Sequence, residues 1–152
     1  MSKIRIAKIE DLNEIMEVIN DTDLPQREES KPKIEERIKS NQLLIYTSDD
    51  KIIGFLGWQS GYQGNQECWY LEQITIHKDH RGKGIGKDFM NYFLQLCRDS
   101  KVKKLYAHIQ SHNERSLRMF LSVDCTINSD ADKSIPNEIT VEFDIDKLCY
   151  LS

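Results

Sequence analysis

The stretch ITIHKDHRGKGIGKDF, residues 74–89, decides the fold of this chain. Its first residues continue an alternating apolar run that is typical of a strand. A basic turn follows, in which Gly82, Gly84 and Gly86 alternate with other residues. Apolar side chains at helical spacing begin at Ile85, so the stretch predicts a strand, a glycine-dense turn and a helix in that order.

The composition of this turn favours a bound anion. Successive glycines let the backbone approach a ligand without hindrance from side chains. The first amides of the following helix attract negative charge, and Arg81, Lys83 and Lys87 add positive charge. We therefore expect the turn to hold a phosphate or pyrophosphate group, although the glycine count alone leaves a plain strand–helix connection equally open.

Two common phosphate-binding motifs do not fit the spacing. A P-loop needs GxxxxGK(S/T), but Asp88 follows the Gly86-Lys87 pair, and Arg81 occupies the place of the first glycine. A Rossmann fingerprint needs GxGxxG, and Lys87 stands where its third glycine is required. No long series of parallel strand–helix–strand units surrounds the turn, so neither motif explains it.

The elements on either side of this stretch predict one mixed domain. Strands are expected at residues 3–9, 42–48, 52–60, 68–77, 103–110, 124–129 and 138–146, and helices after Asp11, after Pro32, from Ile85 and at 114–122. Asp11 and Asn113 are the expected helix caps, and residues 61–67 an expected flexible loop. The strand at 103–110 should run parallel to the strand at 68–77, because strand–helix–strand units cross over in that way. The fold class is therefore α/β, with a mixed α+β sheet in a single domain over residues 1–152.

The composition excludes several classes of function. The chain has 152 residues, 39% hydrophobic and 30% charged, and a net charge of −4 that argues against general nucleic-acid binding. Its apolar runs are too short for a membrane helix, and its N-terminus lacks the apolar core of a secretion signal. The four cysteines form no CxxC pair and the histidines lack metal-ligand spacing, so no metal is expected. Scattered thiols without a signal peptide predict a cytoplasmic protein.

Charge is unevenly distributed along the chain. Residues 10–36 hold ten acidic and three basic side chains, whereas residues 78–104 hold eight basic and three acidic ones. Segments of opposite sign on one domain can serve two ligands of opposite charge. For the acidic segment alone, an ordinary solvated face explains the pattern at least as well.

The turn and its surroundings resemble a known family. Arg81-x-x-Gly84-x-Gly86, between an alternating strand and an amphipathic helix, resembles the acetyl-CoA motif of the GCN5-related N-acetyltransferase (GNAT) superfamily. The stretch HIQSHNERSLRMF is similar to the family's next strand and helix, with Asn113 at an asparagine that commonly contacts the cofactor. The resemblance implies a GNAT-like fold: a mostly antiparallel sheet, a splayed parallel pair formed by the fourth and fifth strands, and about four helices.

The resemblance also implies a cofactor, acetyl-CoA, and the residues that bind it. Main-chain groups of Ile74 and Ile76 would pair with the pantetheine arm, although their side chains also suit an ordinary core. Asn113 would hydrogen-bond that arm, and Phe120 would pack against the cofactor. The pyrophosphate would lie on the turn, at Arg81, Gly82, Lys83, Gly84, Ile85, Gly86 and Lys87.

The resemblance assigns one catalytic residue and leaves another role open. Glu72 matches an acidic position that many members use as the general base, where a half-buried carboxylate can have a raised pKa. Members commonly carry a tyrosine proton donor seven residues after the motif asparagine, but Phe120 stands there and has no proton to give. Water, Tyr106 or Tyr150 remain alternatives for the general acid.

The expected function is therefore acetyl transfer from acetyl-CoA to a primary amine of a small molecule or peptide. No cysteine has a recognisable nucleophile setting, so direct attack in a ternary complex is expected. The acidic segment at 10–36 favours a cationic acceptor. A degenerate domain that binds acyl-CoA without turnover is the main alternative, because of Phe120, and a nucleotide-binding turn is a third. The resemblance also leaves a homodimer open, and no nucleic-acid or membrane partner is expected.

Overall fold

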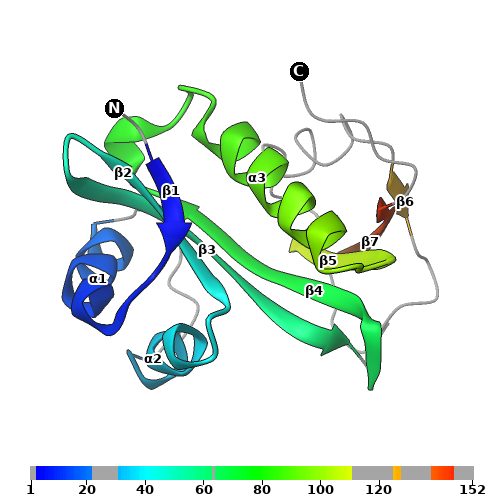
Figure 1. Cartoon of the computed structure of the whole chain (residues 1–152). Coiled ribbons are helices and arrows are strands. Elements are labelled where there is room, and N and C mark those ends of the chain that lie inside the picture. Colours follow the sequence, from blue (N-terminus) through cyan, green and yellow to red (C-terminus); the bar gives the residue numbers. More distant parts are fainter. Residues whose placement is uncertain (1–2, 22–30, 63, 111–124, 128–137, 146–152) are drawn as a thin grey trace. The chain divides into compact units, whose positions relative to one another are not determined.

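The chain forms two compact units in a computed structural model that describes residues 3–21, 31–62, 64–110, 125–127 and 138–145 (Figure 1). The first unit comprises Met1–Trp58 and Gln73–Phe89, and the second comprises Gln59–Glu72 and Met90–Ser152.

The described elements confirm a mixed α/β fold. They are β1 Lys3–Ile6, α1 Leu12–Asn20, α2 Lys31–Lys39, β2 Leu43–Ser48, β3 Lys51–Tyr62, β4 Asn65–Ile76, α3 Ile85–Asp99, β5 Lys104–Gln110, β6 Cys125–Ile127 and β7 Glu138–Asp144. Short 3-10 turns lie at Ile9–Asp11 and Lys78–His80. Among the described residues, seven strands are hydrogen-bonded in the order β1-β2-β3-β4-β5-β7-β6.

In the first unit, two helices pack on an antiparallel set of strands. β1 pairs with β2 and β2 with β3, with a register shift between Tyr46 and Thr47. Helix α1 buries an apolar stripe at the i, i+3, i+4 spacing of an amphipathic helix. The core that joins α1 and α2 to the strands includes Leu12, Ile15, Val18, Ile19, Ile34, Ile38, Leu43, Ile45, Ile52 and Phe55.

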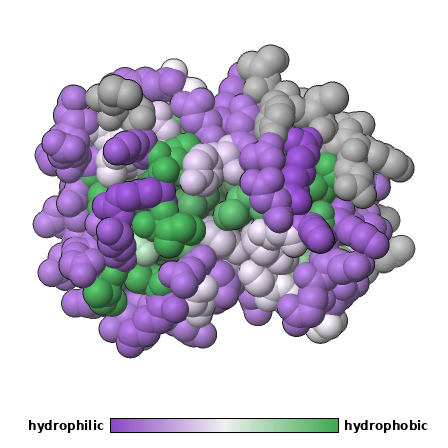
Figure 2. Space-filling model, in the orientation of Figure 1, coloured by the Kyte–Doolittle hydropathy of each residue, from purple (hydrophilic) through white to green (hydrophobic). Residues whose placement is uncertain are grey.

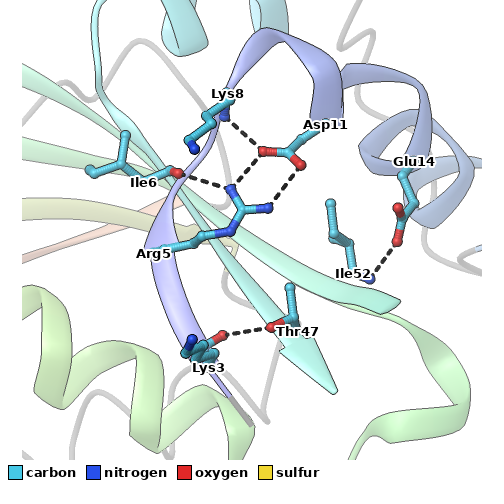
Figure 3. Close-up of polar contacts among 8 residues, drawn as sticks. All are labelled: Lys3, Arg5, Ile6, Lys8, Asp11, Glu14, Thr47 and Ile52. Atoms are coloured by element: carbon cyan, nitrogen blue, oxygen red, sulfur yellow. Dashed lines mark hydrogen bonds and ion pairs between the residues drawn. The ribbon is translucent and has the colours of Figure 1, made fainter. Parts of the chain in front are cut away.

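Polar contacts fix the start of α1 against these strands (Figure 3). Arg5 of β1 donates two hydrogen bonds to the Asp11 carboxylate, at 2.8 and 3.0 Å, and the Lys8 amide donates a third at 2.7 Å. In α1 the Glu14 carboxylate accepts a hydrogen bond from the Ile52 amide of β3. Asp11 stands at the N-cap position of α1, as predicted, but its carboxylate makes no capping hydrogen bond to that helix. It closes the preceding 3-10 turn instead.

In the second unit, β4 and β5 form the parallel pair that the sequence predicts. Their register runs from Cys68 opposite Lys104 to Leu71 opposite Ala107, and β5 then pairs with β7 in the antiparallel sense. The α3 residue Phe93 is fully buried, and its ring lies 6.2 Å from that of Trp69 on β4. The other fully buried side chains of this unit include Met90, Leu94, Cys97, Leu105, Val141 and Phe143.

The loop expected at residues 61–67 is the clearest difference from the sequence-based fold. β3 continues to Tyr62 and β4 begins at Asn65, so most of that segment is strand. β1 is also shorter than expected and ends at Ile6. The helix expected at 114–122 lies outside the described residues.

The described surface is mainly polar. Figure 2 shows hydrophilic side chains over most of the visible face, with small groups of apolar residues between them. Among the described residues, the exposed large hydrophobic side chains are Ile9 and Tyr92. No helix in the described part of the chain is long and apolar enough to cross a membrane.

Candidate active site

The glycine turn links β4 to α3 through a short 3-10 segment. The His77 amide donates to the carbonyl of Ile53 on β3 at 2.8 Å, which fixes the point where the turn leaves the sheet. The His77 Nδ1 atom accepts a hydrogen bond from the Asp79 amide at 3.2 Å, and Arg81 Nε donates to the Ile76 carbonyl at 3.3 Å. The first part of the turn, as far as Arg81, is therefore held close to the end of β4.

Two glycines in the turn have backbone conformations that other residues rarely adopt. The φ angles of Gly82 and Gly84 are +78° and +82°. An added Cβ at either position would meet no atom within 4 Å, so the requirement there is conformational rather than one of space. The same open space leaves the backbone accessible to a ligand.

The start of α3 presents backbone donors next to basic side chains. The first hydrogen bond of the helix runs from the Asp88 amide to the Gly84 carbonyl at 3.1 Å, so the amides of Ile85 and Gly86 precede it. Lys83 and Lys87 are exposed and Arg81 is half-buried. Amides ahead of the first helical hydrogen bond, positive charge and an unobstructed backbone at Gly82 and Gly84 suit the phosphate or pyrophosphate that the sequence predicts here.

A packed cluster that the sequence reasoning missed supports the first turn of α3. Gly54 of β3 faces the backbone of β4, and an added Cβ would lie 3.0 Å from the Thr75 carbonyl oxygen and 3.2 Å from the Phe89 ring. The Tyr46 ring meets Phe89 edge-on at 5.5 Å, and its hydroxyl donates to Asp88 at 3.2 Å. The isolated glycine in an alternating strand was the available signal, because such a glycine often marks a close backbone approach.

The predicted residues of β4 lie in sequence before this turn. Ile74 and Ile76 are half-buried, and Thr75 between them is buried, with its hydroxyl accepting from the Gln73 amide group at 2.8 Å. Glu72 is half-buried as well, immediately after the residues that pair with β5. A partly accessible carboxylate is compatible with the role of a base, while its function stays a prediction.

Tyr106 has a partner that bears on its candidacy as a general acid. Its hydroxyl donates to the Glu142 carboxylate of β7 at 2.7 Å. Burial, followed by this hydrogen bond to a carboxylate, raises the pKa of Tyr106 well above its usual value. The proton therefore stays on the Tyr106 oxygen and is directed at the Glu142 carboxylate, which makes Tyr106 a poor proton donor to a thiolate. Asn113, Phe120 and Tyr150, the other residues with predicted roles, lie outside the described residues.

Cys68 and Cys97 are buried thiols. Cys97 is fully buried, and burial raises its pKa to about 12. Burial also raises the pKa of Cys68. Within the described residues, no group of three or more His, Cys, Asp or Glu side chains could hold a metal ion.

The family of the chain follows from comparison with known proteins. The model of the acetyltransferase (GNAT) family matches residues 10–123, which include the strand, the glycine turn and the helix described above. The chain belongs to this family of acetyltransferases, and acetyl-CoA is its cofactor. The resemblance drawn from the sequence is thereby confirmed.

Individual relatives are more distant. The chain is 29% identical over 56 residues to the L-amino acid N-acyltransferase MnaT of Escherichia coli (strain K12), a match that covers 37% of this chain and 33% of that protein. The match thus spans about a third of the length of the curated relative.

Solved structures share the fold over nearly the whole chain. The PaiA N-acetyltransferase of Thermoplasma acidophilum, crystallised in complex with coenzyme A, aligns with a TM-score of 0.78 at 18% identity over 95% of this chain and 99% of that one. The diaminobutyrate acetyltransferase EctA of Paenibacillus lautus, in complex with its substrate and coenzyme A, aligns with a TM-score of 0.72 at 19% identity over 95% of each chain. The predicted GNAT-like fold is thereby confirmed.

Proposed function

We propose that residues 1–152 act as one acetyltransferase domain that transfers the acetyl group of acetyl-CoA to a primary amine of a small molecule or peptide. The observation that carries this proposal is the glycine turn. Its accessible backbone at Gly82 and Gly84 joins the start of α3, within the segment matched by the family model.

The residues of the turn fit the cofactor and would bind its pyrophosphate. Backbone amides from Gly82 to Lys87, with the charge of Arg81, Lys83 and Lys87, would hold the two phosphates. Main-chain groups of Ile74 and Ile76, together with Asn113 and Phe120, would hold the pantetheine arm. The cofactor supplies an acetyl group activated as a thioester.

Glu72 is the proposed general base. An alkyl amine has a pKa of about 10.4 and is mostly protonated at neutral pH, so it must lose a proton before it attacks. Glu72 would accept that proton directly or through water. As the amine nitrogen replaces the thiol sulfur on the acetyl carbon, it would release a second proton to water and become a neutral amide. A proton from water would neutralise the departing thiolate, because the Tyr106 hydroxyl is hydrogen-bonded to Glu142 and its raised pKa makes it a weak acid.

The acceptor is proposed to be cationic. Part of the acidic segment at residues 10–36, which favoured this from the sequence, is however occupied by contacts within the protein. Several acidic side chains of the N-terminal segment are engaged within the protein: Asp11 with Arg5, Glu14 with the Ile52 amide, and Glu35 with Lys39 at 3.5 Å. The EctA relative acts on L-2,4-diaminobutyric acid, which carries two amino groups. The substrate of this relative supports the proposal that the acceptor of the present chain carries a second positive charge.

Release of CoA thiol, measured across a panel of amines, tests the proposal. Glu72→Gln should lower turnover by roughly a hundred- to ten-thousand-fold if Glu72 is the base. Glu67→Gln is the matched control, because Glu67 is an exposed carboxylate on the same strand. Tight binding of CoA without turnover of any amine would instead favour the acyl-CoA-binding alternative. Unchanged turnover in Glu72→Gln would remove Glu72 as the base and leave acetyl transfer intact.

A further inference from the structure

Three tyrosine side chains from different strands meet in the second unit. The Tyr62 ring of β3 stacks on Tyr70 of β4, with ring centroids 5.4 Å apart and planes 19° apart. The same ring lies 4.9 Å from Tyr106 of β5, which stands opposite Tyr70 in the strand register. All three side chains are half-buried, so part of each remains accessible. We call this group the tyrosine face.

Among the described residues, acidic side chains outnumber basic ones on the side of the sheet that carries the tyrosine face. The Glu142 carboxylate accepts a hydrogen bond from the Tyr106 hydroxyl at 2.7 Å and another from the Lys104 ammonium group at 3.2 Å. Strand alternation places Glu72 on the side of β4 that carries Tyr70, and Asp144 on the side of β7 that carries Glu142. Glu72, Glu142 and Asp144 thus share one side of the sheet with Lys104.

The carboxylate of Glu142 remains ionised over a wide pH range. The hydrogen bond from Tyr106, with a further contribution from Lys104, lowers the pKa of Glu142 although partial burial opposes this effect. An aromatic surface flanked by carboxylates attracts a cation, because the faces of the rings and the carboxylates both carry negative electrostatic potential. A neutral or acidic ligand would gain nothing from this charge balance.

We propose that the tyrosine face binds a second ammonium group of the acceptor while the reactive amine lies at Glu72. Glu72 follows Tyr70 by two residues, a rise of roughly 7 Å along a strand, so the two nitrogens would be separated by a short alkyl chain. This inference rests on the proposed function and deepens it, since it names a diamine as the class of acceptor and Tyr62, Tyr70 and Tyr106 as its specificity residues.

Putrescine and n-butylamine, which differ by one terminal ammonium group, provide the test. Tyr62→Leu removes the ring that contacts both other tyrosines, and Tyr62→Phe keeps it. For Tyr62→Leu we expect the ratio of kcat/KM for putrescine to that for butylamine to fall roughly 3- to 30-fold, the range of a cation–π contact. Tyr62→Phe should retain the ratio, as should Tyr92→Leu, which changes an exposed tyrosine of α3.

A calorimetric titration of putrescine into the protein with CoA present separates the two proposals. We expect Tyr62→Leu to raise the putrescine Kd by a similar factor, and Tyr62→Phe to leave it within about twofold. If putrescine binds in this pattern but no amine is acetylated, the proposed function is wrong and the tyrosine face stands. If amines are acetylated while Tyr62→Leu changes neither ratio nor Kd, or if wild type does not bind putrescine, the inference is overturned.

Discussion

Gly54 and Thr75 lie on neighbouring strands with no room for a side chain between them. An added Cβ on Gly54 would stand 3.0 Å from the Thr75 carbonyl oxygen, closer than nearly all real Cβ contacts. That oxygen belongs to the backbone of β4, which cannot yield as a flexible side chain does. The same Cβ would lie 3.2 Å from the Phe89 ring in the first turns of α3. The glycine therefore sets the spacing between β3 and the two elements that flank the glycine turn.

Gly54→Ala should weaken CoA binding and lower the free energy of unfolding. The new methyl group must push the Thr75 backbone or the Phe89 ring away, and overpacking of this kind costs about 1–3 kcal/mol. Because Thr75 lies next to Ile76, where the glycine turn begins, we expect the CoA Kd to rise severalfold. Urea unfolding and calorimetric titration with CoA would measure the two effects.

Gly57→Ala is the matched control for this change. Its added Cβ would meet mainly the end of the Leu43 side chain at 3.2 Å, which can rotate, and the nearest backbone atom is 3.9 Å away. It should therefore affect CoA binding less than Gly54→Ala does. Equal CoA affinities in the two variants would show that the Gly54–Thr75 spacing has no role in the site.

Tyr46→Phe should isolate the contribution of one hydrogen bond to the position of α3. The change removes the hydroxyl that donates to Asp88 and keeps the ring that packs on Phe89. We expect a loss of about 0.5–1.5 kcal/mol in the free energy of unfolding. The CoA Kd should rise modestly, because Asp88 lies in the first turn of the helix whose amides are proposed to bind pyrophosphate.

Asp88→Asn distinguishes the hydrogen bond from the charge in this pair. The amide oxygen of asparagine can still accept from Tyr46, while the negative charge at the start of α3 is lost. CoA should then bind as tightly as in wild type or more tightly, because repulsion with the phosphates is removed. Weaker binding than in Tyr46→Phe would contradict this account.

Local patterns in the sequence were sufficient for much of the fold. Alternating apolar residues and helical spacing gave the order of elements as far as β5, and the crossover rule gave the parallel β4–β5 pair. The hairpin at 61–67 was missed because its glycines and polar residues resemble a loop. In the structure Gly61 and Gly64, with φ angles of +77° and +78°, allow the two strands to extend much closer to the turn.

The site was only partly predictable for a different reason. The glycine turn is a contiguous motif, so its residue types and spacing are visible in the sequence. The contacts of Tyr46 and Gly54 with Thr75, Asp88 and Phe89, and the approach of Tyr106 to Tyr62, join elements that are far apart in the chain. Residue spacing within a single segment does not contain that information.

Asp11 should make the stability of the first unit depend on pH. Hydrogen bonds from Arg5, assisted by the Lys8 amide, hold the pKa of Asp11 below its usual value (Figure 3). A depressed pKa in the folded state stabilises the protein above the unfolded-state pKa of about 3.9, and this contribution is lost as the pH falls through the folded-state value. Asp11→Asn should therefore reduce the free energy of unfolding by about 1 kcal/mol at pH 7 and by less near pH 3.

Urea unfolding at the two pH values measures this difference. Asp50→Asn is the control, because Asp50 is an exposed carboxylate in the turn between β2 and β3. A loss in Asp11→Asn that is the same at both pH values would mean that packing, and not the ion pair with Arg5, accounts for the effect.

The burial of Cys68 and Cys97 predicts that acetyl transfer does not pass through an acetylated form of either cysteine. Cys97 is fully buried with its pKa raised to about 12, so at pH 8 roughly one molecule in ten thousand carries the nucleophilic thiolate. In a Cys125→Ser, Cys149→Ser variant, Cys68 and Cys97 should react with a thiol reagent only after the protein unfolds in urea. Mass spectrometry after mixing that variant with acetyl-CoA, without an amine, should find neither cysteine acetylated. An acetyl adduct on Cys68 or Cys97 that disappears when an amine is added would replace direct attack with a two-step transfer through the protein.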